Sequence, residues 1–363
     1  MSNLRLPLSH DYNLGAQAQL TDFCGWNMPV SYQGILDEYK ECRENAVIFD
    51  VSHMGRILIE GKDALKFLDF HTTNKISKLK NMKAIYTLLL NEEAGIIDDL
   101  IIYKFNEAKL LVISNAANHD KVIANFNARK NNQEIKIIDL QEELLQIAVQ
   151  GPSAKSIVNP LLDLGEDINY FNFEEIDFYG EKLIVAATGY TGEAGYELYA
   201  SKAVLLDIWN ELTSERGVQP AGLGARDLLR LEAGYCLHGN DIDKNSSPTE
   251  ANLGWNLDTE KAFSIGLEKL TRKNKELKAL IFPKTQKLIP RNGMELFQGG
   301  ESIGKITSGA YSPILDRAIA LAYLKTDLGD EEIMLKQRNK IFKAKVLQEN
   351  WFYRNIKEKM IQE

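Results

Sequence analysis

The feature that most restricts the fold is a regular exchange of strand and helix patterns between residues 56 and 137. Strands show apolar residues at every second position or in short apolar runs, whereas helices show them at spacings of three and four. The elements expected in this stretch are a strand at 56–60, a helix from 64, a hairpin of 96–105 with 110–114, and a helix at 119–130. This order predicts a compact α+β unit.

The remainder of the chain separates into two further patterns. From about residue 143, short apolar runs and amphipathic stretches alternate again; we expect strands at 145–149, 182–187 and 196–200 and helices at 204–212 and 224–233. After residue 270 only short apolar runs remain, at 278–282, 302–306 and 319–324, separated by Gly, Pro and Ser. This tail is typical of a small all-β domain.

Composition excludes several classes of protein. The 363 residues suffice for two to three domains of about 150 residues each. A net charge of −8 argues against a general nucleic-acid surface. Neither a targeting leader nor an apolar run of about 18 residues is present, so we expect a cytoplasmic protein without a membrane span. Cys24, Cys42 and Cys236 form no CxxC pair, and the histidines lack metal-ligand spacing, so we predict no metal site.

Two adjacent carboxylates interrupt an apolar strand pattern at Asp98 and Asp99. On a strand they point to opposite faces, so only one of them is expected to enter a given pocket. A carboxylate among apolar β-branched residues needs partners, and such positions often mark functional sites. A strand-end Asp bound to nearby backbone N–H groups explains the same pattern without any function.

The segment 188–198 contains three glycines within seven residues and carries Tyr190 and Glu197. Glycines let the backbone turn sharply or approach a ligand closely. Tyr190 offers an aromatic face, and the two oxygens of Glu197 match adjacent N–H donors on a heterocycle edge such as that of a pterin. The alternative is an ordinary hairpin with an exposed glutamate.

Arg226 and Arg230 lie one turn apart on an expected helix, with Asp227 and Glu232 nearby. They fit either an anion-binding face or a solvated row of ion pairs. His53, in the segment 49–55, has the most suggestive context of the five histidines. No Cys or Ser nucleophile motif accompanies it, so a structural role is favoured.

Taken in chain order, these segments resemble the aminomethyltransferase, or T-protein, family of the glycine cleavage system. The recognisable signature is Gly189-Tyr190-Thr191-Gly192-Glu193. The other matching segments are residues 23–30, 49–54, 91–99, 114–116, 222–227, 230–234, 239–243 and 248–251. Each segment alone is weak, but the ordered set spans nearly the whole chain.

The resemblance implies a three-lobed α+β fold with a ferredoxin-like lobe and a C-terminal β-barrel, and a tetrahydrofolate channel between the lobes. The expected lobes are residues 1–52 with 138–230, 53–137 with 231–270, and 271–363. The implied reaction transfers the one-carbon unit of an aminomethyl-lipoyl carrier protein, the H-protein, to tetrahydrofolate. Its products are methylenetetrahydrofolate, ammonia and the dihydrolipoyl carrier, and no metal takes part.

The resemblance also implies roles for particular residues. Asp99 is expected to be the catalytic aspartate, which hydrogen-bonds or deprotonates the attacking folate nitrogen. Glu197 would hold the pterin edge. The remaining folate-binding positions are Met54, Tyr86, Asn115, Tyr190 and Arg226. Arg291 matches an arginine that contacts the lipoyl arm, although the C-terminal barrel matches least well, which leaves Arg291 and Tyr353 open.

Two other functions share this fold and remain open at this point. One is a folate-dependent demethylase of another small donor. The other is a folate-binding assembly factor for iron–sulfur proteins, which would carry a Lys-Gly-Cys motif, whereas the segment around Cys236 reads Ala233-Gly234-Tyr235-Cys236. The basic stretch from Lys269 to Arg291 is either a docking surface for an acidic carrier protein or a solvated linker.

Overall fold

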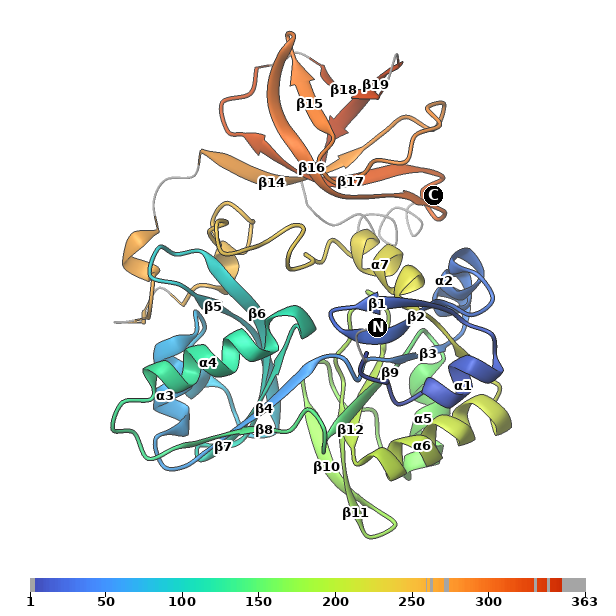
Figure 1. Ribbon diagram of the computed structural model, residues 1–363, viewed down its shortest axis with the longest axis vertical. Helices are drawn as coiled ribbons and strands as arrows, with labels where there is room; N and C mark the ends of the chain where they lie inside the picture. The colour runs from blue at the N-terminus through green and yellow to red at the C-terminus, as the bar shows by residue number, and fades with distance from the viewer. Residues whose placement is uncertain are drawn as a thin grey trace. The chain divides into compact units, whose positions relative to one another are not determined.

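The expected α+β pattern is present in the computed structural model (Figure 1). The structure describes residues 4–258, 260–261, 264–270, 274–329, 332–337 and 340–347. Its internal contacts divide the chain into two units, and we treat each by itself. The first unit comprises residues 1–89, 97–226 and 258–264; the second comprises 90–96, 227–257 and 265–363.

Residues 56–137, where strand and helix patterns alternate, form most of a five-stranded sheet in the first unit. Its strand order is β5 (Lys83–Leu90), β6 (Ile96–Asn106), β7 (Lys109–Ser114), β4 (Gly55–Glu60) and β8 (Lys136–Asp139). The helices are α3 (Ala64–His71) and α4 (His119–Arg129). Chain order β4-α3-β6-β7-α4-β8 with β4 between β7 and β8 is the ferredoxin-like arrangement, with β5 added at the edge. The predicted ferredoxin-like lobe is therefore confirmed.

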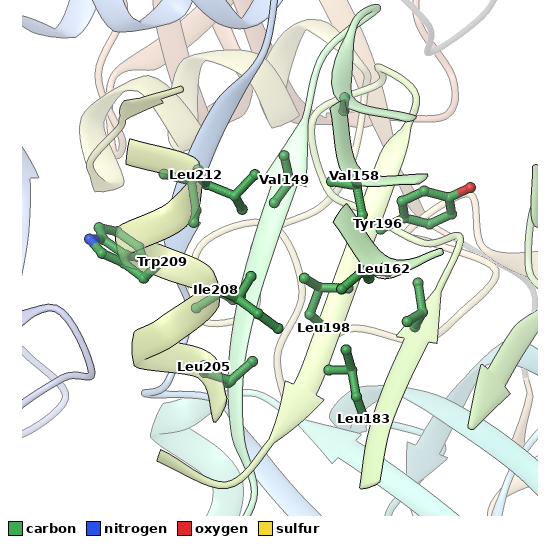
Figure 2. Close-up of a cluster of buried hydrophobic side chains, with 14 of the residues drawn as sticks. Val149, Val158, Leu162, Leu183, Tyr196, Leu198, Leu205, Ile208, Trp209 and Leu212 are labelled. Carbon is green, nitrogen blue, oxygen red and sulfur yellow. The ribbon is translucent and has the colours of Figure 1, made fainter. Parts of the chain in front are cut away.

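A second, six-stranded sheet completes the first unit. Its order is β10 (Phe173–Phe178), β11 (Glu181–Ala186), β12 (Gly195–Ala200), β9 (Leu145–Gln150), β3 (Val47–Asp50) and β13 (Gln219–Pro220). Side chains of α5 (Ala154–Leu162) and α6 (Lys202–Asn210) pack on this sheet, and Trp209 is fully buried there (Figure 2). Every second residue of β12 points into this core, as Tyr196 and Leu198 show, so the residues between them face the opposite way.

That opposite face packs against the ferredoxin-like sheet. One apolar cluster joins Tyr103 and Ile113 of the ferredoxin-like sheet to Ile184 and Tyr199 of the six-stranded sheet. Glu197 is the residue of β12 that shares this face with Tyr199. The two sheets thus bring polar residues from β6 and β12 into one region of the first unit.

The remaining elements of the first unit are a hairpin and two helices near the N-terminus. The hairpin consists of β1 (Gln19–Phe23) and β2 (Trp26–Ser31), and its turn residues Cys24 and Gly25 both have positive φ. The helices are α1 (His10–Gly15) and α2 (Ile35–Glu44). Short 3-10 turns lie at Ile76–Lys78 and Ala116–Asn118, and a π-helical turn at Glu211–Glu215; the 3-10 turns at Gly254–Asn256 and Leu267–Lys269 belong to the second unit.

The second unit contains the all-β domain that the tail predicted. Six strands close into a barrel in the order β14 (Lys275–Ile281), β17 (Arg317–Lys325), β16 (Glu301–Ser312), β15 (Glu295–Gln298), β18 (Ile333–Gln337) and β19 (Lys340–Val346). Alternate residues of these strands fill the interior, among them Leu280, Leu296 and Ala320. The helix α7 (Leu223–Glu232) crosses the division, so that Arg226 belongs to the first unit and Arg230 to the second.

Candidate functional site

Asp99 lies on β6 and receives hydrogen bonds from both strands that flank β6. Asn115, which directly follows β7, donates through Nδ2 to Asp99 Oδ1 over 2.7 Å. Tyr86 on β5 donates its hydroxyl to Asp99 Oδ2 over 3.2 Å. Asp99 is partly exposed, so its carboxylate is held by neutral donors while it remains accessible. Three of the predicted site residues are therefore brought together.

Asp98 is fully buried, and so the exposure of the two aspartates alternates along β6 as a strand requires. Their separation is incomplete, however, because Asn115 Nδ2 also donates to Asp98 Oδ1 over 2.8 Å. Burial raises the pKa of Asp98, and the neighbouring charge of Asp99 raises it further. Asp98 therefore takes up a proton at a higher pH than an ordinary aspartate, which limits the repulsion within the pair.

Glu197 on β12 is only 7% exposed, so the alternative of an exposed hairpin glutamate is wrong. Thr188 donates its hydroxyl to Glu197 Oε2 over 2.6 Å, and Gln146 Nε2 donates to Oε1 over 3.0 Å. The hydroxyls of Tyr103 and Tyr199 lie farther away, each 3.5 Å from Oε2. Each tyrosine hydroxyl has a single hydrogen and a nearer oxygen to receive it, Thr188 Oγ1 at 2.9 Å for Tyr103 and the Tyr103 hydroxyl at 3.0 Å for Tyr199. With Gln146 on Oε1 and Thr188 on Oε2, a carboxylate of about four lone-pair positions then keeps acceptor capacity on both oxygens.

Arg226, in the first turn of α7, lies against aromatic rings of the first unit. Its guanidinium carbon is 5.0 Å from the ring centre of Tyr190 and 5.9 Å from that of Phe49. Burial lowers the pKa of Arg226, while the charge of Glu197 acts in the opposite direction. Its Nη1 is buried and has no hydrogen-bond partner among the residues that the structure describes. A charged donor is thus available in the electrostatic neighbourhood of Glu197.

The glycine-rich segment is held in place by a buried ion pair. Arg43 Nη1 contacts Glu193 Oε1 over 2.9 Å and donates to the carbonyl of Thr191 over 2.8 Å. A Cβ atom at Gly189 would come within 1.9 Å of Gln150 Oε1, so this glycine serves a close approach to protein atoms. These contacts tie the segment that carries Tyr190 to α2 and β9.

A single face of β6 connects the two groups of polar residues. Asp99 and Tyr103 lie four residues apart on this face, about 13 Å between their Cα atoms. Tyr103 reaches the hydroxyl of Thr188 over 2.9 Å and that of Tyr199 over 3.0 Å. Met54 packs against the same apolar cluster as Tyr103. All the predicted folate-binding residues thus belong to the first unit.

His53 is buried near these groups, and its Nδ1 has no hydrogen-bond partner within the described part of the chain. Burial lowers the pKa of His53 to about 3, and the positive charges of Arg226 and Arg56 act in the same direction. The imidazole is therefore neutral at physiological pH. This agrees with a structural role.

The prediction that Arg226 and Arg230 form one functional or solvated face is wrong. Arg230 is 1% exposed and belongs to the second unit, where its Nη1 lies 2.7 Å from the buried Asp241 Oδ2. Its Nη2 donates to Ser308 Oγ on β16 over 2.8 Å. Helical spacing placed the two arginines together, but the tertiary environment separates them.

Sequence reasoning missed Gln146, Thr188, Tyr103 and Tyr199 as partners of Glu197. Gln146 carried the only usable signal, since it is a polar residue in the apolar run of β9. Tyr103 and Tyr199 occur in strand patterns typical of ordinary packing, and Thr188 stands in the glycine-rich segment 188–198 without any feature that pointed to Glu197. Their role depends on contacts between two sheets, which single-strand patterns do not contain.

Arg291 is exposed in the second unit, in the segment before β15. Within the described part of the basic stretch, Lys278 Nζ lies 3.0 Å from Glu276 Oε1, and Lys284 Nζ lies 3.6 Å from Asp316 Oδ2. Residues 271–273 and Tyr353 lie outside the described residues. Among the described residues, no group of His, Cys, Asp and Glu side chains is arranged to hold a metal ion, and no helix is long and apolar enough to cross a membrane.

Comparison with known proteins identifies two matching domain families. Residues 9–261 match the GCVT N-terminal domain, and residues 275–353 match the glycine cleavage T-protein C-terminal barrel domain. The aminomethyltransferase of Halothermothrix orenii is 39% identical over 339 residues, which cover 91% of this chain and 95% of that protein. The aminomethyltransferase of Thermosipho melanesiensis is also 39% identical, over 94% of this chain and 95% of that protein.

A solved structure shows the same relationship. The crystal structure of the glycine cleavage system aminomethyltransferase T from Bartonella henselae superposes with a TM-score of 0.89 at 30% sequence identity. The match covers 96% of this chain and 98% of that one. Sequence and structure therefore agree over nearly the full length.

Proposed function

The chain belongs to the glycine cleavage T-protein family and is an aminomethyltransferase, and from this premise we propose that its substrates are tetrahydrofolate and an aminomethyl-lipoyl carrier protein. A folate nitrogen attacks the methylene carbon, and the bond from that carbon to the lipoyl sulfur breaks. A second folate nitrogen then bonds to the same carbon as the amino group leaves as ammonia, which yields methylenetetrahydrofolate and the dihydrolipoyl carrier. The relatives' names favour this donor over those of demethylases.

The observation that carries the proposal is the pair of polar groups along β6. The Glu197 carboxylate keeps acceptor capacity in a buried setting, which suits the adjacent N–H groups of a pterin edge. Asp99 lies about 13 Å along β6 from Tyr103, whose hydroxyl is 3.5 Å from Glu197 Oε2, and it provides a second and partly exposed carboxylate. A folate, which has a polar ring edge at one end of an extended molecule, fits such a spacing.

In this proposal Asp99 acts on the attacking nitrogen. The donors Asn115 and Tyr86 fix its two carboxylate oxygens, so one lone pair can be directed at a substrate N–H without rearrangement. Removing or sharing that proton raises the nucleophilicity of the nitrogen. Met54 and Tyr190 line the folate, while Arg226 adds a charged donor beside the pterin.

We further propose that the carrier's lipoyl arm contacts Arg291, because this arginine is exposed and offers several donors. The basic stretch from Lys269 to Arg291 would then orient an acidic carrier protein. The three expected lobes, residues 1–52 with 138–230, 53–137 with 231–270, and 271–363, remain our proposed division. The two sheets of the first unit and the closed barrel support it.

The test is a single-turnover reaction of the full chain with aminomethylated lipoyl carrier protein and tetrahydrofolate. Methylenetetrahydrofolate and ammonia should appear together in a one-to-one ratio. Ammonia release without methylenetetrahydrofolate would show that folate is not the acceptor. Folate binding with no turnover would contradict the proposed donor while it preserved the folate site.

A further inference from the structure

Gln146 occupies an unusual position for a long polar side chain. It lies on β9, between β12 and β3 in the six-stranded sheet, and is 1% exposed. Its Nε2 donates to Glu197 Oε1 over 3.0 Å and to the hydroxyl of Tyr199 over 3.1 Å. In the opposite orientation of the amide, Gln146 Oε1 would face Glu197 Oε1, and both atoms are acceptors. These contacts therefore define which end of the Gln146 amide carries the nitrogen.

The amide oxygen of Gln146, Oε1, therefore makes neither of these two contacts, which belong to Nε2. It is buried and has no hydrogen-bond partner among the described residues. A buried acceptor without a partner costs about 1–3 kcal/mol, and a group of this kind needs an explanation. Because Oε1 and Nε2 share one carbon atom, this acceptor lies close to the carboxylate of Glu197.

Glu197, Gln146 and Arg226 together present a defined set of hydrogen-bonding groups. Glu197 supplies two acceptor oxygens, Gln146 Oε1 one further acceptor, and Arg226 Nη1 one donor. A ligand that satisfies this set has three N–H groups and one carbonyl oxygen on a single edge. The pyrimidine edge of a reduced pterin has this composition, with two N–H groups on the 2-amino nitrogen, one at N3, and a 4-oxo group.

We propose that Gln146 determines specificity in the tetrahydrofolate site, where its Oε1 accepts a hydrogen bond from the 2-amino group of the pterin. The inference rests on the proposed function. Glu197 takes N3–H and one hydrogen of the 2-amino group, and Gln146 takes the second hydrogen. Arg226 Nη1 donates to the 4-oxo group, so each of the buried orphan atoms of these two residues gains a partner.

A simpler role must be distinguished, in which Gln146 only holds Glu197 in place. Both roles predict weaker folate binding when Gln146 is replaced. A 2-methylamino analogue of tetrahydrofolate separates them, because it retains one N–H for Glu197 and has a methyl group in place of the hydrogen for Gln146. Thr188 provides the matched control, since it donates to Glu197 over 2.6 Å but has no part in the proposed contact.

The experiment is anaerobic titration calorimetry of the full chain with tetrahydrofolate and with the 2-methylamino analogue. The wild type should prefer tetrahydrofolate by about tenfold or more. Gln146→Met should bind tetrahydrofolate about tenfold more weakly and lose the preference, whereas Thr188→Val should bind both ligands more weakly and keep it. Gln146→Asn keeps an amide in the core and gives the same test if the methionine variant does not fold.

A Gln146 variant that retains the wild-type preference would overturn the inference, because the residue would then act only through Glu197. Failure of the proposed function has a different signature, in which the wild type itself does not bind tetrahydrofolate. Loss of the preference in the Gln146 variants alone supports the inference.

Discussion

Each unit contains a buried cluster of charged and polar side chains, and the two clusters differ in how completely their groups are paired. In the second unit, Asp241 accepts from Arg230, from the backbone N–H of Leu237 over 2.9 Å and from the hydroxyl of Thr307. In the first unit, Gln146 and Arg226 each keep a buried polar atom without a partner among the described residues.

The difference is the one we expect between a structural cluster and a cluster that binds a ligand. A closed cluster connects α7 to β16 and leaves no group for a ligand. An open cluster carries an energetic cost in the free protein, and a ligand with complementary groups removes that cost. Arg226 and Arg230 lie one turn apart on the same helix, so the comparison is made between two arginines in the same secondary structure.

The largest effect is expected for Asp99→Asn, which tests the proposed site in the first unit. The variant keeps the shape of the side chain but loses the basic oxygen, so the single-turnover rate should fall by about 10²–10⁴-fold. The free energy of unfolding should change by less than about 1 kcal/mol, because Asp99 is partly exposed. An unchanged rate would remove Asp99 from the mechanism.

Substitutions in the closed cluster around Arg230 should change the free energy of unfolding. Asp241→Asn leaves the charge of Arg230 buried without its fully buried partner, so the free energy of unfolding should fall by about 3–5 kcal/mol in urea denaturation. Asp227→Asn removes the exposed partner of the same arginine and should cost about 1 kcal/mol or less. Equal losses in the two variants would contradict the assignment of Asp241 as the structural anchor.

His53 adds a pH dependence to the first unit. Its pKa in the folded protein is lowered to about 3, whereas the unfolded chain takes up this proton near pH 6.5. Protons then bind preferentially to the unfolded state between these values, so the free energy of unfolding falls as the pH decreases. Between pH 7 and pH 5 we expect a loss of about 2 kcal/mol from His53.

His53→Gln should remove this part of the acid sensitivity, as measured by denaturation at the two pH values. His71, whose pKa is also lowered by burial, to about 4, is unchanged in both proteins, so the comparison isolates His53. If wild type and variant lose equal stability on acidification, the pKa of His53 is the same in the folded and the unfolded protein.

The smallest effect is expected for Arg226→Lys. Lysine keeps the charge but loses the planar fork and the stacking on Tyr190, so tetrahydrofolate should bind about tenfold more weakly. Titration calorimetry measures this change. Arg230→Lys is the matched control on the same helix, and it should lower the free energy of unfolding. The comparison would be invalid if Arg226→Lys lowered the free energy of unfolding and Arg230→Lys weakened tetrahydrofolate binding instead.

Local patterns were sufficient for much of the fold. The hairpin of β6 and β7 and the helix α4 follow from alternation and helical spacing within single segments. The short tail strands predicted an all-β domain because Gly, Pro and Ser separated them, and the family resemblance predicted that this domain is a barrel. The family resemblance pointed to Asp99, Tyr86 and Asn115, which the structure joins by hydrogen bonds.

Interactions between distant segments were beyond such patterns. Gln146 becomes meaningful only when β9 lies beside β12, and the opposite environments of Arg226 and Arg230 arise where α7 passes from one unit to the next. A carboxylate pair on a strand should diverge, yet Asn115 reaches both aspartates from the end of a neighbouring strand. Each case depends on tertiary contacts that a linear pattern does not encode.

The position of β3 between β9 and β13, two strands that come much later in the sequence, has a consequence for how the chain folds during synthesis. Val47 pairs with Gln150 of β9 and with Gln219 of β13, while the whole ferredoxin-like sheet lies between β3 and β9 in the sequence. The inserted sheet consists of nearer neighbours, so it can form first as the chain leaves the ribosome. The strand β3 must remain without its partners until more than a hundred further residues have emerged, a period in which a chaperone can protect its exposed edge.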